Sequence, residues 1–321
     1  MSLQFPLITV LGPTAVGKTI FAAHLAHCLN AEILSADSRQ VFRGMDIGTG
    51  KDIGDYFVDG QLIPFHLIDI ADAGTEYSVY RFQLDFQSAY KNIVRRGKIP
   101  VLCGGTGLYI ESILKGYDFY EVPVDEELRQ TLDLLSDAEL ISMLSALRPL
   151  HATTDTCDRS RLLRAIEIES HQKNNPIKRT GTNFANTPVF GIRFERKTVR
   201  QRITDRLTQR LNVGMIEEVE KLISQGISAE RLKSYGLEYK YIAMFLSGEL
   251  NYNDLFRLLN TAIHQFAKRQ MTWFRRMESK GINIIWLDGE EGLQNNLNNA
   301  LFHLKTMEEK NKPKNEKSVL P

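Results

Sequence analysis

The sequence predicts an α/β protein in which a parallel sheet is flanked by helices and carries an inserted helical domain. Near the N-terminus, a glycine-rich loop follows an apolar run. Short apolar segments then alternate with helical patterns, which is the order of βαβ units. Between residues 118 and 187 a segment rich in Leu, Glu and Asp interrupts this alternation. We therefore expect a core at residues 1–117 and 188–307, a helical insertion at residues 118–187 and a disordered tail at residues 308–321.

Composition excludes several classes of protein. With 321 residues, of which 43% are hydrophobic and 25% charged, the chain can bury a sizeable core and exceeds the usual size of one compact unit. The net charge of +1 excludes a globally basic nucleic-acid binder, so a polyanion site must be a local patch. The three cysteines are widely spaced, which argues against a disulfide framework or a zinc site. Because no apolar run approaches the ~20 residues of a membrane span, we expect a soluble cytoplasmic protein without a membrane partner. We also expect a monomer.

The first predicted strand leads into a phosphate-binding loop. An apolar run at residues 7–11 is followed by the pattern Gly-x-x-x-x-Gly-Lys-Ser/Thr and then by a helical segment. The loop consists of Gly12, Pro13, Thr14, Ala15, Val16, Gly17, Lys18 and Thr19. In such a loop the backbone amides and the helix N-terminus face phosphate oxygens, the lysine reaches the outer phosphates, and the last hydroxyl can bind Mg²⁺. The loop predicts a P-loop NTPase-like fold and a ligand with a diphosphate or triphosphate, without identifying that ligand.

Two further predicted strands end in polar residues. Because ligands of parallel sheets lie beyond the carboxyl ends of the strands, we expect these residues near the glycine-rich loop. The strand at residues 33–36 runs into Asp37, which is either a helix N-cap or a functional carboxylate. A carboxylate beside phosphate must face Mg²⁺ or accept a proton. The strand at residues 99–103 ends in two glycines and Thr106, where many phosphate-loop NTPases have a metal-binding acid. Thr106 could donate to a phosphate oxygen or belong to a simple turn, and Asp69 could supply the missing acid.

Helices dominate the rest of the chain. In the insertion, the patterns predict helices at residues 125–135, 138–147 and 159–172, then a loop at residues 173–188. A strand at residues 190–194 returns to the sheet. The remaining expected elements are helices at about 199–225, 240–246 and 253–280 and a strand at 282–287.

Two of these helices carry basic stripes. Arg202, Arg206 and Arg210 recur every four residues beside an apolar stripe of the same helix. Like charges at this spacing repel, so an anion bound against the row would explain it, and a solvated face is the alternative. The helix at residues 253–280 carries a second basic stripe interleaved with amide and aromatic side chains, which suits RNA or a plain surface.

Together these segments resemble the tRNA dimethylallyltransferases, also called tRNA isopentenyltransferases. The similarity extends over about residues 7–288 and rests on segments at residues 12–19, 35–51, 66–69, 104–109, 161–167 and 267–275. The segment from Asp37 to Lys51 is the most specific, because generic phosphate-loop NTPases lack it. The chain departs from the family around Tyr239 and Lys240, and Phe65 stands where a second histidine is common.

The resemblance implies transfer of a dimethylallyl group from dimethylallyl diphosphate to the exocyclic amine of the adenosine just 3′ of the anticodon in tRNA. The loop would hold the diphosphate together with Mg²⁺ at Thr19. Asp37 would be the general base, and Thr106 would lie near the bridging oxygen of the diphosphate. Lys18 and Arg206 would stabilise the departing diphosphate.

The resemblance also implies that the anticodon stem-loop of tRNA is a partner. The insertion would contact it through Arg161 and Arg164. The implied contacts on the core are Asp37, Ser38, Arg39, Gln40, Tyr239, Lys240, Lys268, Arg269, Gln270, Trp273 and Arg275.

Other functions fit parts of these patterns. A phosphate-loop kinase of small molecules or nucleosides would share the fold, Mg²⁺ and Lys18, but would turn over ATP. A non-catalytic, nucleotide-dependent RNA-binding protein would need no base at Asp37. An enzyme that prenylates free adenine nucleotides would use the same loop, but the basic helix and the insertion favour tRNA.

Overall fold

In the computed structural model, residues 5–117, 119, 121–150, 159–174, 184 and 187–311 are described. The chain divides into a compact unit of residues 1–117 and 182–321 and a second unit of residues 118–181. Residues 312–321 of the expected tail and most of the expected loop at residues 173–188 lie outside the described residues.

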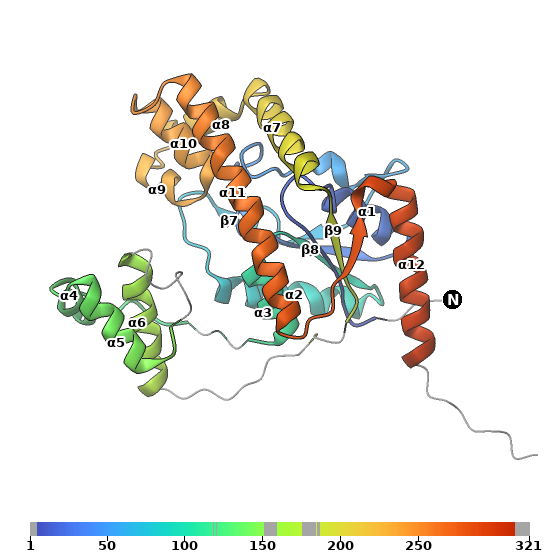
Figure 1. Cartoon of the computed structure of the whole chain (residues 1–321), viewed down its shortest axis with the longest axis horizontal. Helices are drawn as coiled ribbons and strands as arrows, with labels where there is room; N and C mark the ends of the chain where they lie inside the picture. Colours follow the sequence, from blue (N-terminus) through green and yellow to red (C-terminus); the bar gives the residue numbers. More distant parts are fainter. Residues whose placement is uncertain are drawn as a thin grey trace, which may run out of the picture. The chain divides into compact units, whose positions relative to one another are not determined.

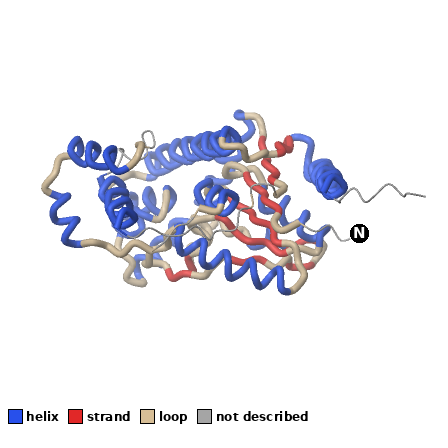
Figure 2. Tube along the Cα trace, turned by 90° about the horizontal axis from the view of Figure 1, so that it is seen from below, coloured by secondary structure: helices blue, strands red, loops and turns tan. Residues whose placement is uncertain are grey.

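The larger unit is built on a parallel sheet, as predicted. In the described residues the sheet has six strands in the order β10-β9-β1-β8-β2-β6, and all the paired neighbours are parallel. Its strands are β1 (Ile8–Leu11), β2 (Glu32–Ala36), β6 (Phe65–His66), β8 (Pro100–Gly104), β9 (Val189–Arg193) and β10 (Ile285–Asp288). Figure 2 shows these strands between helices. The short edge strand β6 lies in the segment whose acid, Asp69, was one candidate for the metal-binding acid.

Alternating side chains of the strands pack against helices on both faces. Ile8, Val10 and Ile33 belong to a core shared with α1 (Lys18–Leu29) and α12 (Gly292–Asn311). Leu7, Leu11 and Leu34 face the opposite core, which includes side chains of α2 (Val79–Arg95), α3 (Gly107–Lys115) and the end of α11 (Tyr252–Ser279). The helix α12 was not predicted, and its end at Asn311 lies past the expected start of the tail.

A third core joins the helices that follow β9. Figure 1 shows these helices in yellow to orange. They are α7 (Arg196–Asn212), α8 (Met215–Ser224), α9 (Ala229–Ser234), α10 (Leu237–Leu246) and α11. The single helix expected at residues 199–225 is two helices, because Gly214 has a φ of 104° and begins α8 in the left-handed region.

Short elements connect β2 to α2 in the larger unit. They are β3 (Phe42–Arg43), the 3₁₀ turn η1 (Ile53–Tyr56), β4 (Phe57–Val58), β5 (Gln61–Leu62) and β7 (Ala71–Asp72). A second 3₁₀ turn, η2 (Gly289–Glu291), precedes α12.

The smaller unit contains three helices in its described residues, α4 (Glu126–Asp133), α5 (Asp137–Leu147) and α6 (Arg159–Asn174), close to the predicted ranges. Its core consists of Leu132, Leu140, Leu144, Leu162 and Ile166.

Candidate active site

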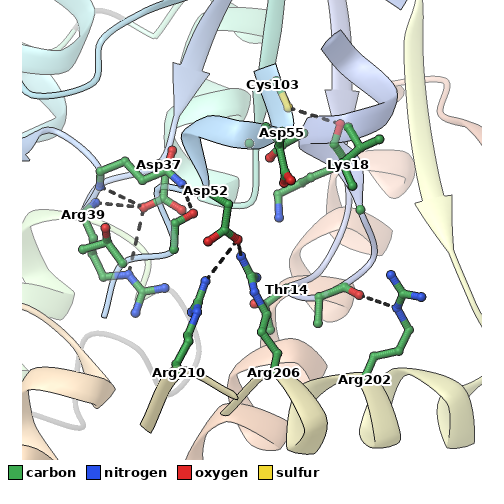
Figure 3. A pocket seen from close by; sticks show the side chains of 18 of the residues that line it. Thr14, Lys18, Asp37, Arg39, Asp52, Asp55, Cys103, Arg202, Arg206 and Arg210 are labelled. Carbon is green, nitrogen blue, oxygen red and sulfur yellow. Dashed lines mark hydrogen bonds and ion pairs between the residues drawn. The ribbon is translucent and has the colours of Figure 1, made fainter. Parts of the chain in front are cut away.

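A cavity of about 380 Å³ lies beyond the carboxyl ends of β1, β2 and β8. Figure 3 shows it lined by the glycine-rich loop, by acids from the segment after β2 and by arginines of α7. The loop, Asp37 and the arginine row, which are far apart in the sequence, therefore face one space.

The glycine-rich loop bends tightly between β1 and α1. Ala15 and Gly17 have φ angles of 65° and 78°, in the left-handed region. At Gly12 a Cβ atom would stand 2.9 Å from the carbonyl oxygen of Ile192, so only glycine fits there. Lys18 Nζ donates to the carbonyl of Pro13 at 3.3 Å, and burial lowers the pKa of this ammonium despite nearby acidic groups. Lys18 is partly buried and faces the cavity, where a bound anion would raise its pKa again.

Gln270 of α11 spans the loop and the end of β8. Its Oε1 accepts a hydrogen bond from the amide of Thr14 at 2.9 Å, and its Nε2 donates to the carbonyl of Gly105 at 2.9 Å. The residue is only 7% exposed. Both polar atoms of its amide group bind the backbone, so Gln270 holds the glycine-rich loop against the end of β8 at the wall of the cavity. The RNA contact expected at Gln270 stays a prediction.

Asp37 and Thr106 follow the neighbouring ends of β2 and β8, which pair at Ala36 and Gly104. Thr106 is not among the residues that line the cavity. Asp37 Oδ1 accepts from the amides of Arg39 at 2.9 Å and Gln40 at 3.4 Å. Thr106 Oγ1 accepts from the amide of Ser38 at 3.1 Å. Asp37 lines the cavity, so this carboxylate caps its own turn and also faces the space beside Lys18.

The row of arginines on α7 faces the same cavity. Arg202 Nε donates to the carbonyl of Ala15 at 2.7 Å and holds the glycine-rich loop. Arg206 forms an ion pair with Asp52, and Arg210 Nη2 lies 3.6 Å from the same carboxylate. Although burial opposes ionisation, Arg206 and Arg210 hold the pKa of Asp52 below its usual range. In this structure, the negative charge that faces the arginine row is the carboxylate of Asp52.

Several residues of the Asp37–Lys51 segment hold its backbone in place. Gln40 accepts from the Ser35 hydroxyl at 3.0 Å and donates to the carbonyl of Gly50 at 3.0 Å. Lys51 is buried and bound to Asp46 and Asp69. Asp69 is therefore engaged by Lys51 and is not among the residues that line the cavity.

Tyr239 is fully buried and its hydroxyl donates to Glu218 at 2.7 Å. Glu218 in turn accepts from the amides of Asp46, Ile47 and Gly48. The ring packs beside Gly48 in the core, so its side chain supports the segment after β2, and the RNA contact expected at Tyr239 stays a prediction. Its neighbour Lys240 is exposed.

Other expected RNA contacts differ in exposure. Lys268, Arg269 and Arg275 are exposed along α11. Trp273 is half-buried: a Cβ atom at Gly107 would stand 2.4 Å from its Cδ1, and the Arg276 guanidinium lies 4.1 Å from its ring centroid.

Arg39 is held inside the larger unit. It donates to Glu238 at 2.7 Å, and its guanidinium lies 5.3 Å from the centroid of the Phe266 ring.

Within the insertion, Arg161 is exposed and Arg164 is partly buried. Arg164 donates to Glu167 at 2.8 Å and to the carbonyl of Val122 at 2.6 Å. Glu167 is buried and also binds Arg129. Arg164 therefore supports the helices of this unit, and only its remaining surface is open to a partner.

For a metal ion, the cavity offers the hydroxyl of Thr19 in the first turn of α1. No three His, Cys, Asp or Glu side chains gather into a metal site anywhere in the described ranges. A hydroxyl and phosphate oxygens suit Mg²⁺, which keeps several of its waters and binds few protein ligands. None of the described helices has the length and apolar character to cross a membrane.

Sequence reasoning missed Asp52 and the structural role of Gln270. The only signal for Asp52 was its place directly after the most specific segment, and Gln270 stood out only as an amide between basic residues.

Comparison with known proteins gives consistent results. The family model described as IPP transferase matches residues 40–277. A tRNA dimethylallyltransferase 2 of Bacteroides fragilis is 51% identical over 295 residues, covering 92% of this chain and 96% of that protein. One of Porphyromonas gingivalis is 53% identical over 282 residues, covering 88% of this chain and 93% of that protein.

Solved structures share the fold. A tRNA delta(2)-isopentenylpyrophosphate transferase of Staphylococcus epidermidis superposes with a TM-score of 0.66 at 31% identity, covering 94% of this chain and 99% of that one. A eukaryotic dimethylallyltransferase acting on tRNA superposes with a TM-score of 0.74 at 22% identity, covering 97% of this chain and 81% of that one.

Proposed function

The chain belongs to the tRNA dimethylallyltransferase family, and we propose that it transfers a dimethylallyl group from dimethylallyl diphosphate to the exocyclic amine of the adenosine 3′-adjacent to the anticodon. The observation that carries the proposal is that Asp37, Lys18 and Arg206 line one cavity. Thr106 lies beside them, bound to the amide of Ser38, the residue after Asp37. A general base and cations for a leaving group thus share one site.

In the proposed reaction, the amine nitrogen forms a bond to the allylic carbon while the bond from that carbon to the diphosphate oxygen breaks. The amine is a poor nucleophile, so the departing diphosphate must be stabilised by the loop amides, Lys18 and Arg206. The nitrogen loses a proton as it attacks. Asp37 accepts it, through Oδ2, because Oδ1 already receives backbone amides.

Thr106 would donate its hydroxyl proton toward the bridging oxygen in place of its 3.5 Å bond to Ser38 Oγ, while its Oγ1 accepts from the Ser38 amide. Mg²⁺, when bound, would be held by Thr19 and the diphosphate oxygens and would withdraw charge from the leaving group. Holding both reactants in line contributes up to ~7 to 11 kcal/mol of the lowered barrier.

For the tRNA, we propose that Lys268, Arg269 and Arg275 contact phosphates, since these side chains are exposed on α11. Arg161 and Lys240 are exposed candidates elsewhere on the chain. The cytoplasmic location and the monomeric state stay predictions.

The test is incubation with radiolabelled dimethylallyl diphosphate, Mg²⁺ and unmodified tRNA that carries an adenosine 3′ of the anticodon. Label should enter that tRNA and not a matched tRNA with guanosine at the position. Phosphoryl transfer from ATP without label in the RNA would contradict the proposal and favour a kinase.

A further inference from the structure

Asp52 occupies the space between two arginines of the candidate active site. Figure 3 shows its carboxylate between Arg206 and Arg210, with an ion pair to each. Asp52 lies directly before η1, and its side chain is 47% exposed. It can therefore turn toward solvent without disturbing the packed core.

Arg210 has hydrogen-bonding capacity that the chain does not use. Its side chain is 13% exposed, and its Nη2 is buried with no hydrogen-bond partner in the described residues. Burial, reinforced by the neighbouring Arg206, lowers the pKa of Arg210 to about 10. A buried guanidinium with an unused donor that faces a cavity indicates that a stronger acceptor than Asp52 can bind it.

The segment around Gly50 is built to let both arginines approach. A Cβ atom at Gly50 would stand 2.0 Å from Arg210 Nη2 and 2.9 Å from Arg206 Nη2, so any side chain would displace them. The carbonyl of Gly50 is held by Gln40, and the next residue, Lys51, is buried. The backbone on both sides of Gly50 is therefore held in place, and it positions the Asp52 carboxylate beside the guanidinium groups of Arg206 and Arg210.

We propose that Asp52 is an internal counter-anion that competes with the diphosphate for Arg206 and Arg210, and that Arg210 is a second diphosphate-binding arginine. This inference rests on the proposed diphosphate site. A diphosphate beside Lys18 carries more charge and more acceptor oxygens than one carboxylate, so it takes the guanidinium groups and Asp52 turns outward. When the reaction has released the diphosphate, Asp52 competes for the same groups and weakens the retention of this product.

The test is titration of inorganic pyrophosphate with Mg²⁺ into the full-length protein by calorimetry. Asp52→Asn should bind pyrophosphate on the order of tenfold more tightly, because a repulsive charge and a competitor are both removed. Arg210→Met should bind on the order of tenfold more weakly. Damage to the fold does not raise affinity, so the gain for Asp52→Asn separates this role from a structural one.

Asp205→Asn is the matched control, because Asp205 also lines the cavity but accepts its hydrogen bond from Gln201. An equal gain in that variant, or unchanged or weaker binding by Asp52→Asn, would overturn the inference. Lys18→Met should lose binding. If the wild type binds pyrophosphate and Lys18→Met does not, an unresponsive Asp52→Asn overturns only the inference, whereas absence of binding to the wild type overturns the proposed site as well.

Discussion

Thr106 Oγ1 accepts a hydrogen bond of 3.1 Å from the backbone amide of Ser38, the residue after Asp37. This bond ties the turn after β8 to the turn after β2. The Thr106 hydroxyl in turn donates to Ser38 Oγ at 3.5 Å. The proposed base and the proposed hydroxyl donor are thus positioned by one backbone turn.

Removing the carboxylate should stop transfer without stopping RNA binding. For Asp37→Asn we expect single-turnover transfer to fall about 10² to 10⁴-fold, because the amide cannot accept the proton. The affinity for tRNA, measured by filter binding, should change by less than about threefold. Asp46→Asn, which changes an acid bound to Lys51, is the control and should retain transfer. Transfer by Asp37→Asn near the wild-type rate would show that another group is the base.

The depressed pKa of Lys18 predicts a pH effect on ligand binding. Burial lowers this pKa, so Lys18 loses its charge at a lower pH than an ordinary ammonium. A bound diphosphate raises the pKa again, and pyrophosphate binding in the alkaline range should therefore take up protons. Calorimetry in two buffers with different ionisation enthalpies measures this uptake. Lys18→Met should abolish the proton uptake that comes from this side chain. Equal proton uptake by the wild type and by Lys18→Met would show that Lys18 is not the group that is protonated.

Gln270 should matter to stability and to the diphosphate site together. Gln270→Ala leaves the amide of Thr14 and the carbonyl of Gly105 without this partner, which should cost about 1 to 3 kcal/mol in the free energy of unfolding. Because Thr14 lies in the glycine-rich loop, KM for dimethylallyl diphosphate should also rise. Denaturant unfolding and steady-state kinetics test the two effects. Gln265→Ala, an exposed residue on the same helix, is the control, and equal behaviour of the two variants would refute a positioning role.

A buried carboxylate in α3 should contribute to acid denaturation. Glu111 is fully buried, and hydrogen bonds from Lys280, Tyr117 and Arg276 hold its pKa below the usual value although burial opposes this. Since the folded pKa is lower than the unfolded one, the stabilisation is complete above about pH 4.3 and is lost as the pH falls through the folded pKa.

Glu111→Gln should be about 1 to 3 kcal/mol less stable at neutral pH. Its unfolding free energy should also fall less steeply than that of the wild type below about pH 4.3. Glu290→Gln, at an exposed position, should follow the wild type in both respects. Chemical denaturation at a series of pH values measures the unfolding free energy of each protein. If this free energy depends on pH in the same way for Glu111→Gln and the wild type, Glu111 does not contribute to acid denaturation.

The basic stripe of α11 should contribute to the salt dependence of RNA binding. If Lys268 contacts a phosphate, Lys268→Ala should lower the slope of log affinity against log salt by about 0.7 to 1. The exposed Arg95, at the end of α2, supplies the control variant Arg95→Ala. An unchanged slope for Lys268→Ala would place the RNA backbone elsewhere.

The sheet, and the position of Asp37 and Lys18 at one edge of it, could be predicted from the sequence. The strands that carry these residues are recognisable as apolar runs. In a parallel sheet the carboxyl ends of the strands share one edge, so the residues directly after the strands converge there. The helix boundary at Gly214 could not be found from periodicity, because the apolar repeat continues through it.

The buried polar residues could not be predicted in the same way. Tyr239 and Gln270 stand beside charged residues in the sequence and have the composition of a binding surface. Their burial depends on which helices pack over the segment that follows β2, and no local pattern records this. The pairing of Asp52 with Arg210 likewise joins two segments that only the tertiary fold brings together.

Glu218 receives the amides of Asp46, Ile47 and Gly48 at 2.8, 2.6 and 3.0 Å, which is how a bound phosphate or sulfate is commonly held by consecutive backbone amides. The chain therefore fills one such amide cluster permanently with its own carboxylate. These three amides are therefore not available to an anion from solution, whereas the cavity beside the glycine-rich loop is open.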